Sequence, residues 1–244
     1  MVRSTQIDNR KVLAIFDVDN TLIDLGGAID FDALLVDAFR ELGVGVPPLA
    51  ERDRLWRAGK DHAVLLRSWG VLDPRAFWDI FDRLDFEARS VAIQAKKITL
   101  FPDCVPALWS LYTSGQVVLA VHTNTPIKLA RYQLKHFDIA KYFDAVLALD
   151  IDGYDQSRAK PEPWGVHHLQ ATARDKHGED LMKRTVLIGD SRIDMETARN
   201  AGIPGVLISR EAARGMGEFE AVTSLDRITP SYLDDVIRRF DARC

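Results

Sequence analysis

Four short apolar runs, each followed directly by polar residues, limit most strongly how this chain can fold. The runs are residues 12–16, 117–121, 145–149 and 186–188. Successive apolar residues without alternation are typical of strands that are buried on both faces of a parallel sheet. Residues 206–208 and, more weakly, 221–222 repeat the pattern. We therefore expect a mainly parallel sheet.

Segments of helical length separate the predicted strands. Asp103 is placed to cap the start of a helix that Gly115 would end. Further helices are predicted over residues 127–137, 163–174 and 193–200. Strands that alternate with helices favour an α/β fold, here a doubly wound, Rossmann-like domain.

The stretch 24–100 interrupts this alternation, because it contains helical patterns and no convincing strand. Apolar residues recur every three or four positions between Asp30 and Gly43, which are suited to begin and end a helix. A second apolar face of helical spacing follows in the same stretch. The sequence therefore predicts one α/β core, residues 1–23 and 101–244, interrupted by a small helical domain, residues 24–100.

Charge and cysteine content narrow the partners and the compartment. The 244 residues carry a net charge of −4, so no sequence-wide positive field is available to hold a nucleic acid or an anionic membrane. The two cysteines, Cys104 and Cys244, are too few for a disulfide framework. No apolar run approaches the roughly 18 residues of a membrane span. We expect a cytoplasmic protein without nucleic-acid or membrane partners.

Asp17 and Asp19 form the sharpest local motif, an Asp-Val-Asp-Asn-Thr sequence directly after the first predicted strand. Two carboxylates at the end of a strand can converge on one cation where the chain turns, and oxygen ligands suit Mg²⁺. Asp and Asn are equally common in turns and at helix starts. Taken alone, the motif leaves both a metal site and a structural turn open.

Polar residues after the other strands give three further candidate segments. Thr123 and Asn124 offer a hydroxyl and an amide to a phosphate, although either could also cap a helix. Lys160 lies in a loop held extended by prolines and could reach an anion, although most lysines are solvated surface charges. Asp190 ends the fourth strand, and Asp194 lies in the helix that follows. The carboxyl ends of parallel strands form one crevice, so these residues are expected to converge with the first motif.

Taken in order, these segments resemble the motifs of the haloacid dehalogenase-like (HAD) hydrolase superfamily. The motifs are Asp17-x-Asp19-x-Thr21, Thr123, Lys160 with Pro161, and Gly189-Asp190-Ser191-x-x-Asp194. The helical insertion after the first motif is similar to the family's cap of the first type, as in members that resemble phosphoglycolate phosphatase. The resemblance implies a HAD-like core with a helical cap domain over the active site.

The resemblance also implies a catalytic role for both aspartates of the first motif. Asp17 would attack phosphorus and become an aspartyl phosphate. Asp19 would protonate the leaving alkoxide and later take a proton from water, which requires surroundings that oppose its ionisation. The dehalogenase and phosphonatase branches lack this second aspartate, so its presence favours phosphate chemistry.

A metal site and a phosphate site follow from the same resemblance. Mg²⁺ would be held by Asp17, the main-chain carbonyl of Asp19, Asp190 and Asp194, the last directly or through water. The transferring oxygens would be bound by Thr123, the Asn124 backbone and Lys160.

Substrate specificity is expected to reside in the cap, whose closure would exclude water. Its basic and imidazole side chains are candidate substrate contacts: Arg52, Arg54, Arg57, Lys60, His62 and Arg67. Arg57 has the spacing of ordinary helical ion pairs with Asp53 and Asp61, which favours a surface role. Trp56 and Trp69 are interpreted as cap core.

The leading hypothesis is a Mg²⁺-dependent phosphatase that hydrolyses a small phosphorylated metabolite, a phosphomonoester, through an aspartyl-phosphate intermediate. A phosphosugar mutase would use the same nucleophile but return the phosphate to a sugar. A non-catalytic phosphate-binding or regulatory protein would keep the fold without turnover, although the intact motif residues argue against it. The sequence predicts neither the substrate nor the oligomeric state.

Overall fold

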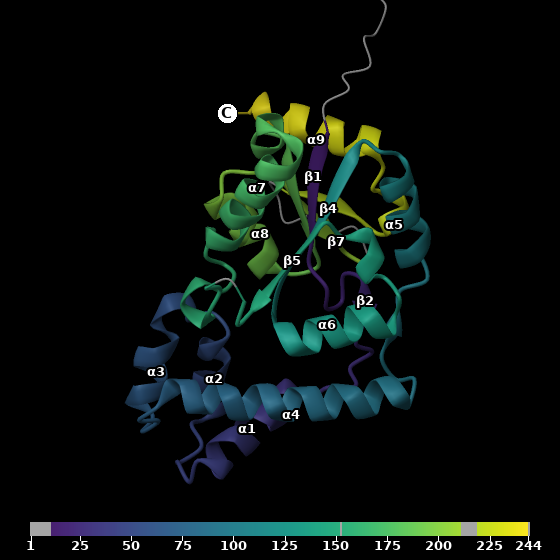
Figure 1. Cartoon of the computed structure of the whole chain (residues 1–244). Coiled ribbons are helices and arrows are strands. Elements are labelled where there is room, and N and C mark those ends of the chain that lie inside the picture. Colours follow the sequence, from purple (N-terminus) through teal and green to yellow (C-terminus); the bar gives the residue numbers. More distant parts are fainter. Residues whose placement is uncertain (1–10, 152, 211–218, 244) are drawn as a thin grey trace, which may run out of the picture.

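A six-stranded parallel sheet forms the centre of the protein (Figure 1). The computed structural model describes residues 11–151, 153–210 and 219–243. The strands lie in the order β5-β4-β1-β6-β7-β8, and each neighbouring pair is parallel. Their bounds are β1 Val12–Phe16, β4 Val117–Pro126, β5 Ala145–Leu149, β6 Thr185–Gly189, β7 Gly205–Ile208 and β8 Glu220–Val222. The predicted α/β fold with a parallel sheet is confirmed.

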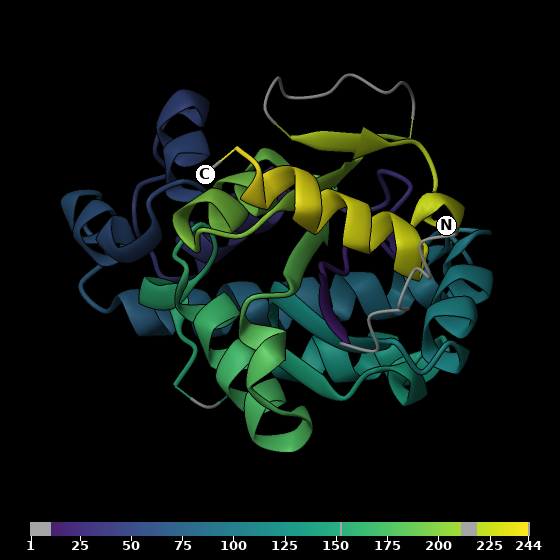
Figure 2. The same cartoon turned by 90° about the horizontal axis from the view of Figure 1, so that it is seen from above.

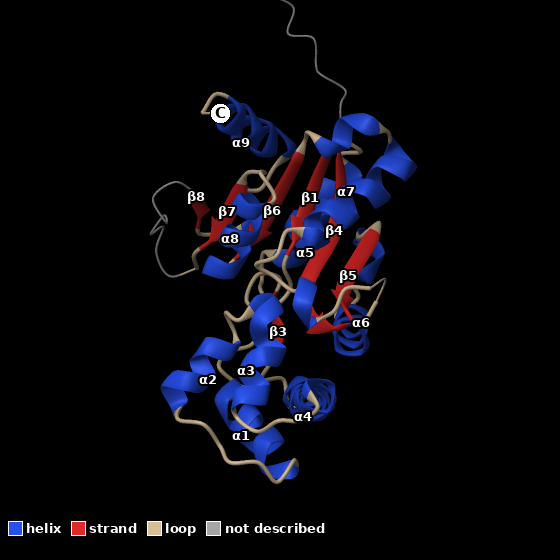
Figure 3. Cartoon of the chain, turned by 90° about the vertical axis from the view of Figure 1, so that its left-hand side faces the viewer, coloured by secondary structure: helices blue, strands red, loops and turns tan. Residues whose placement is uncertain are grey.

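Helices cover both faces of the sheet (Figure 3). They are α5 Cys104–Thr113, α6 Ile127–His136, α7 Trp164–His177, α8 Arg192–Asn200 and α9 Pro230–Asp241. Successive β1 side chains point to opposite faces, so Ala14 and Phe16 pack in the layer of α5, α6 and α9. Leu13 and Ile15 pack in the layer of α7 and α8. Short 3₁₀ helices occupy Gly59–Asp61, Ala140–Tyr142, Gln156–Arg158, Glu179–Met182 and Leu225–Arg227.

The helical insertion forms a layer of its own beyond the carboxyl ends of the strands (Figures 1 and 3). Its helices, which we call the cap, are α1 Phe31–Glu41, α2 Leu49–Leu55, α3 His62–Ser68 and α4 Pro74–Gln94. They enclose a small apolar core that includes Phe39, Leu66 and Phe77. The chain enters and leaves the cap through two short antiparallel strands, β2 Ile23–Asp24 and β3 Thr99–Leu100. Helix α9 lies at the opposite end of the sheet (Figures 1 and 2).

Local sequence explains where the two longest cap helices begin. The Asp30 carboxylate accepts a hydrogen bond from the Ala33 amide at 3.0 Å, which caps α1 as predicted. Asp73 caps α4 in the same way, and Pro74 occupies its first position, where no backbone donor is needed. Gly43 follows α1 with φ of +67°, a conformation that glycine adopts without strain.

Some elements differ from the sequence predictions. The paired strands β2 and β3 were not expected, because two residues are too few to show a periodic pattern. Asp103 precedes α5 but does not cap it. Its carboxylate instead accepts hydrogen bonds from the Ser224 hydroxyl and the Leu225 amide, both at 2.8 Å. The contact ties α5 to the segment that leads into α9, a helix the sequence analysis did not predict.

Two further expectations concerned the role of the cysteines and the absence of a membrane-spanning segment. Cys104 is fully buried with a free thiol, as expected for a packing residue. Cys244 lies outside the described residues. In the part of the chain that the structure describes, none of the helices combines the length and the apolar character needed to cross a membrane.

Candidate active site

Three aspartates from neighbouring strand ends meet at the carboxyl edge of the sheet. Asp17 directly follows β1, Asp190 directly follows β6, and Asp194 lies in the first turn of α8. One carboxylate oxygen of each lies within 4.8 Å of the others. Because β1 and β6 are parallel neighbours, the residues that follow them emerge side by side. The structure therefore brings together the carboxylates that the sequence analysis assigned to one site.

Lys160 lies among these carboxylates. Its buried ammonium donates hydrogen bonds to Asp17 Oδ1 and Asp194 Oδ1, both at 2.6 Å. Burial alone would lower the pKa of Lys160, but the two carboxylates outweigh burial and hold the pKa above its ordinary value. Burial, opposed by Lys160 and reinforced by the other aspartates, raises the pKa of Asp17 well above its usual range. One ammonium thus leaves an excess of negative charge in the cluster.

Asp194 is fixed by the start of α8. Its Oδ2 accepts hydrogen bonds from the Ser191 amide at 3.1 Å and the Ser191 hydroxyl at 2.5 Å, and Ser191 caps the helix in return. Gly189 allows this approach, because a Cβ there would lie 2.3 Å from Asp194 Cγ. Both oxygens of Asp194 are engaged, whereas Asp17 Oδ2 accepts no hydrogen bond from the described residues.

The Lys160 backbone is held by the Asn124 side chain. Asn124 Nδ2 donates to the Lys160 carbonyl at 3.1 Å, and the Lys160 amide donates to Asn124 Oδ1 at 2.9 Å. The Tyr154 hydroxyl donates to the same Oδ1 at 2.6 Å. Asn124 therefore positions the lysine through its side chain, whereas the sequence analysis considered that amide only as a phosphate donor or a helix cap. Nearby Thr123 is buried, and its hydroxyl accepts a hydrogen bond from the Thr125 amide.

His122 extends this chain of contacts into the layer of α7. His122 precedes Thr123 in β4, so its side chain points to the opposite face of the sheet, where it is fully buried against Gly165. Its Nε2 also lies 3.0 Å from the Tyr154 hydroxyl. Burial lowers the pKa of His122 well below its usual range, so the ring is neutral. A Cβ at Gly165 would lie 2.1 Å from Nε2, so only glycine leaves room for the ring.

An arginine from the cap holds Asp19. Arg89 Nη1 donates to both carboxylate oxygens of Asp19, at 2.6 and 2.7 Å, and Arg89 Nε donates to Asp85 Oδ1 at 2.8 Å. The Thr125 hydroxyl donates to Asp19 Oδ2 at 3.0 Å. Arg89 and Asp85 are buried, and the sequence analysis identified neither of them nor Thr125 as a site residue.

The contact between Arg89 and Asp19 joins the cap to the core. Arg89 comes from α4 of the cap, so it contacts Asp19 only while the cap lies against the core.

The buried ion pairs around Arg89 predict a specific stability pattern. Arg89→Gln leaves the Asp85 carboxylate buried without a cation, so it should lower the unfolding free energy by about 3–5 kcal/mol. Adding Asp85→Asn should restore part of the loss. Urea unfolding of both variants measures this effect, with Arg83→Gln as a matched control on the exposed side of α4. Equal losses in the single and double variants, or an equal loss in the control, would contradict the assignment.

A cavity of about 420 Å³ lies between the cap and the strand ends. Its core wall includes Asp17, Asp19, Asn20, Thr123, Asn124, Lys160 and Asp190. Its cap wall includes Phe31, Trp56, His62, Trp78, Phe81, Asp82, Asp85 and Arg89. A substrate in this cavity would therefore contact both the strand-end motifs and the cap.

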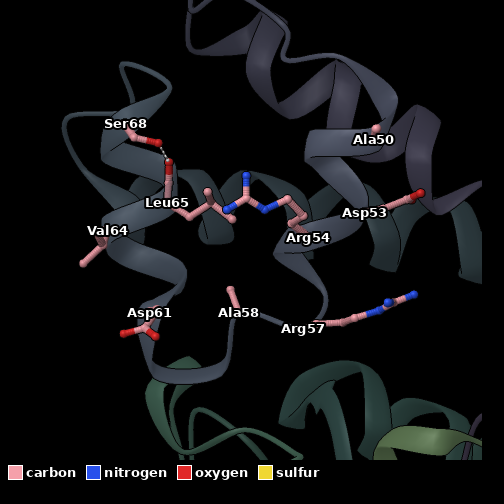
Figure 4. Close-up of a pocket in the computed structure, with 9 residues that line it drawn as sticks. All are labelled: Ala50, Asp53, Arg54, Arg57, Ala58, Asp61, Val64, Leu65 and Ser68. Carbon is pink, nitrogen blue, oxygen red and sulfur yellow. Dashed lines mark hydrogen bonds between the residues drawn. The ribbon is translucent and has the colours of Figure 1, made fainter.

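Most of the basic cap residues considered as substrate contacts do not line this cavity. Arg52 is buried and donates to the Asp32 carboxylate, while Arg54 pairs with Glu51 on the surface. Arg54 and Arg57 line a separate, open hollow of about 810 Å³ between α2 and α3 (Figure 4). Among the described residues, Arg57 forms no ion pair, so the pairs predicted from its spacing are absent.

Two of the cap predictions concern residues at the substrate cavity itself. His62 lines the cavity, whereas Lys60 and Arg67 do not. Trp56 contacts Trp78 and Phe81, but it is 37% exposed and faces the cavity, so the interpretation of Trp56 as cap core is wrong. Trp69 packs against Phe39 in the cap core with ring centroids 6.0 Å apart.

Comparison with known proteins identifies the family. The family model described as haloacid dehalogenase-like hydrolase matches residues 14–208, most of the chain. The chain belongs to the HAD-like hydrolases. A phosphoglycolate phosphatase from Rhodobacter capsulatus is 31% identical over 205 residues, which cover 79% of this hydrolase and 82% of the relative.

Solved structures share the fold of this hydrolase. CbbY from Rhodobacter sphaeroides, in complex with phosphate, has a TM-score of 0.64 at 20% identity and covers 91% of this chain and 98% of its own. YfnB from Bacillus subtilis, bound to magnesium, has a TM-score of 0.56 at 17% identity and covers 89% and 96%. At these identities the likeness concerns the fold alone.

The donor set of this hydrolase fits a divalent cation. Its oxygens come from Asp17, Asp190 and Asp194, and all-oxygen sites suit Mg²⁺. Burial and the neighbouring charge of Asp194 raise the pKa of Asp190 to about 7. A cation among the three carboxylates would offset the negative charge that Lys160 leaves unbalanced. Asp17 and Asp190 are the more available ligands, since both oxygens of Asp194 already accept hydrogen bonds.

Metal removal should therefore change how stability depends on pH. Without metal, the folded protein holds a proton on Asp190 that the unfolded chain releases above a pKa of 3.8, so stability falls as pH rises toward about 7. The same Mg²⁺ concentration should be used at both pH values, about 100 times the Kd that applies at pH 8. It should raise the melting temperature by about 5 °C at pH 8 and by less at pH 5.5, where protons compete for the carboxylates. Thermal unfolding in EDTA and in Mg²⁺ measures both effects. An equal Mg²⁺ effect at the two pH values would contradict the site.

Proposed function

We propose that this HAD-like hydrolase is a Mg²⁺-dependent phosphatase acting on a small phosphorylated metabolite. The observation that carries the proposal is the arrangement around Lys160, whose ammonium lies 2.6 Å from both Asp17 and Asp194 beside the cavity. A lysine and a divalent cation on either side of one carboxylate can bring that carboxylate to an anionic phosphate. Membership of the family and the phosphatase relative support the same conclusion.

In this proposal Asp17 is the nucleophile. Its Oδ2 has no hydrogen-bond partner among the described residues and is available to attack phosphorus. The attack forms a bond from Asp17 to phosphorus and breaks the bond to the ester oxygen. Asp19 gives a proton to the leaving oxygen and later takes one from the water that hydrolyses the aspartyl phosphate. Arg89 and the Thr125 hydroxyl hold the Asp19 carboxylate in place beside the cavity.

The remaining motif residues bind charge in this proposal. Asp17, Asp190 and the Asp19 carbonyl would hold Mg²⁺, with Asp194 in support, and the cation would offset the charge of the phosphate. Lys160, Thr123 and the Asn124 backbone contact the transferring oxygens. The contacts between the Asn124 side chain and the Lys160 backbone keep the lysine in place during the reaction.

We further propose that residues 24–100 act as a cap domain and residues 1–23 and 101–244 as the catalytic core. The substrate cavity lies between the two parts, and Arg89 joins them through Asp19. Closure of the cap would exclude water from the leaving group and complete the pocket.

Phosphate release tests the proposal directly. The purified protein with Mg²⁺ should release phosphate from a generic aryl phosphate and from at least one member of a panel of phosphorylated metabolites, and EDTA should abolish the release. Absence of phosphate release from the entire panel would exclude a phosphatase. Isomerised sugar phosphate without free phosphate would indicate a mutase instead.

A further inference from the structure

Four large aromatic side chains line the cavity from the cap: Phe31, Trp56, Trp78 and Phe81. One face of α4 contributes Trp78, Phe81, Asp82, Asp85 and Arg89, whose helical spacing places them along the cavity. Phe31 and Trp56 complete the wall from the other side. The rings support one another, with centroids 6.4 Å apart for Trp56 and Trp78 and 5.6 Å apart for Trp56 and Phe81. The faces of such π-systems are negative and attract a cation on the leaving group.

The cations that line the cavity are already paired. Lys160 bonds to two carboxylates, and Arg89 bonds to Asp19 and Asp85. His62 accepts a hydrogen bond from the Trp78 indole at Nδ1, 3.0 Å away, and burial lowers the pKa of His62. The imidazole is therefore neutral and adds no positive charge. An anionic leaving group, such as one that ends in a carboxylate, would find no available cation on this wall among the described residues.

Asp82 is a carboxyl group without a partner on the cap wall. It lines the cavity between Trp78 and Asp85 and has no hydrogen bond or ion pair with the described residues. Burial and the negative charges of Asp150, Asp85 and Asp79 raise its pKa to about 8. A cation bound beside Asp82 would favour its ionised form, whereas an anion would favour the protonated acid.

Building on the proposed phosphatase function, we propose that the leaving group of the substrate carries an ammonium cation. The cation binds against the indoles of Trp56 and Trp78, with the Asp82 carboxylate as its counter-ion. Aromatic faces together with a carboxylate are the surroundings that favour a substituted ammonium over a neutral group of the same shape. The substrate class is thus an aminoalkyl phosphomonoester, which hydrolysis converts to an amino alcohol and phosphate.

A pair of isosteric esters tests the charge alone. Phosphocholine and 3,3-dimethylbutyl phosphate have the same shape, but the second has a neutral carbon in place of the cationic nitrogen. With the Mg²⁺-loaded protein, kcat/KM should be at least about 10-fold higher for phosphocholine, and lower again for phosphoglycolate. Equal values for the two isosteres, or a preference for phosphoglycolate, would overturn the inference.

Variants of the cap show which side chains produce the preference for phosphocholine. Asp82→Asn keeps the shape of the side chain and should reduce the ratio between the two isosteres to about 1. Glu87→Gln removes an exposed carboxylate on the same helix that pairs with Arg83 and is not among the charges that raise the pKa of Asp82, so it should leave the ratio unchanged. Trp56→Leu should lower the ratio as well, because it removes one aromatic face. An unchanged ratio in Asp82→Asn would refute the counter-ion.

The experiment separates this inference from the proposed function. Hydrolysis of an aryl phosphate without a preference for phosphocholine would leave the phosphatase in place and reject the ammonium site. If no ester is hydrolysed, calorimetric binding of the two isosteres to the unmodified protein in Mg²⁺ tests the ammonium site without turnover. Tighter binding of phosphocholine by at least about 10-fold supports the site, and equal binding rejects it.

Discussion

Replacing Asp17 with Asn is expected to reduce turnover by at least about 10⁴-fold, because an amide does not form the acyl phosphate. The loss should be the same for aryl and alkyl phosphates, since both require the nucleophile. Phosphate release under saturating substrate and Mg²⁺ measures it. Near-normal turnover in this variant would remove Asp17 from the role that we propose.

The same variant should remain folded. Burial and the neighbouring aspartates raise the pKa of Asp17, so a neutral side chain of the same shape relieves repulsion in the metal-free protein. The melting temperature in EDTA should therefore equal or exceed that of the unmodified protein. A large drop would show that lost activity reflects unfolding rather than lost chemistry.

Asp19→Asn is expected to slow turnover by about 10²–10⁴-fold, with a larger loss for alkyl than for aryl phosphates. An aryl oxide leaves without a proton, whereas an alkoxide needs one from Asp19. Because the second proton transfer is also lost, the aspartyl phosphate should accumulate. The kcat values of a matched aryl and alkyl ester measure the first effect.

The intermediate provides an independent readout for Asp19→Asn. Acid quenching followed by intact-mass measurement should detect one added phosphoryl group per chain, and Asp17→Asn serves as the control without it. Equal losses for the two esters together with no phosphorylated protein would contradict an acid–base role for Asp19.

The sequence was informative about the core because each strand is a continuous apolar run. Two of the predicted runs, 12–16 and 145–149, coincide with β1 and β5. The strand ends then place Asp17 and Asp190 together, since neighbouring parallel strands share one carboxyl edge. Motif order was enough to select Lys160, although nothing local distinguishes it from a surface lysine. Its partners are 143 and 34 residues away along the chain.

The cap side of the site could not be predicted in the same way. Asp85 and Arg89 have the spacing of an ordinary surface pair, and only the packing of α4 on the core shows that they are buried. Arg89 meets Asp19 across 70 residues, and Thr125 meets it across 106, so no local pattern signals either contact. His62 was among the cap candidates, but Asp82 has no local motif and gains significance only from the cavity that it lines.

The contact between Gly165 and His122 predicts which positions of the fold tolerate substitution and which do not. The path from Gly165 through His122, Tyr154 and Asn124 to Lys160 links the layer of α7 to the lysine that we propose binds phosphate. A scan of all single substitutions should therefore find position 165 intolerant even of alanine, although it lies in a helix and contacts no substrate. Intolerant positions would trace this path inward, while the solvent-facing side of the same helix stays free to vary.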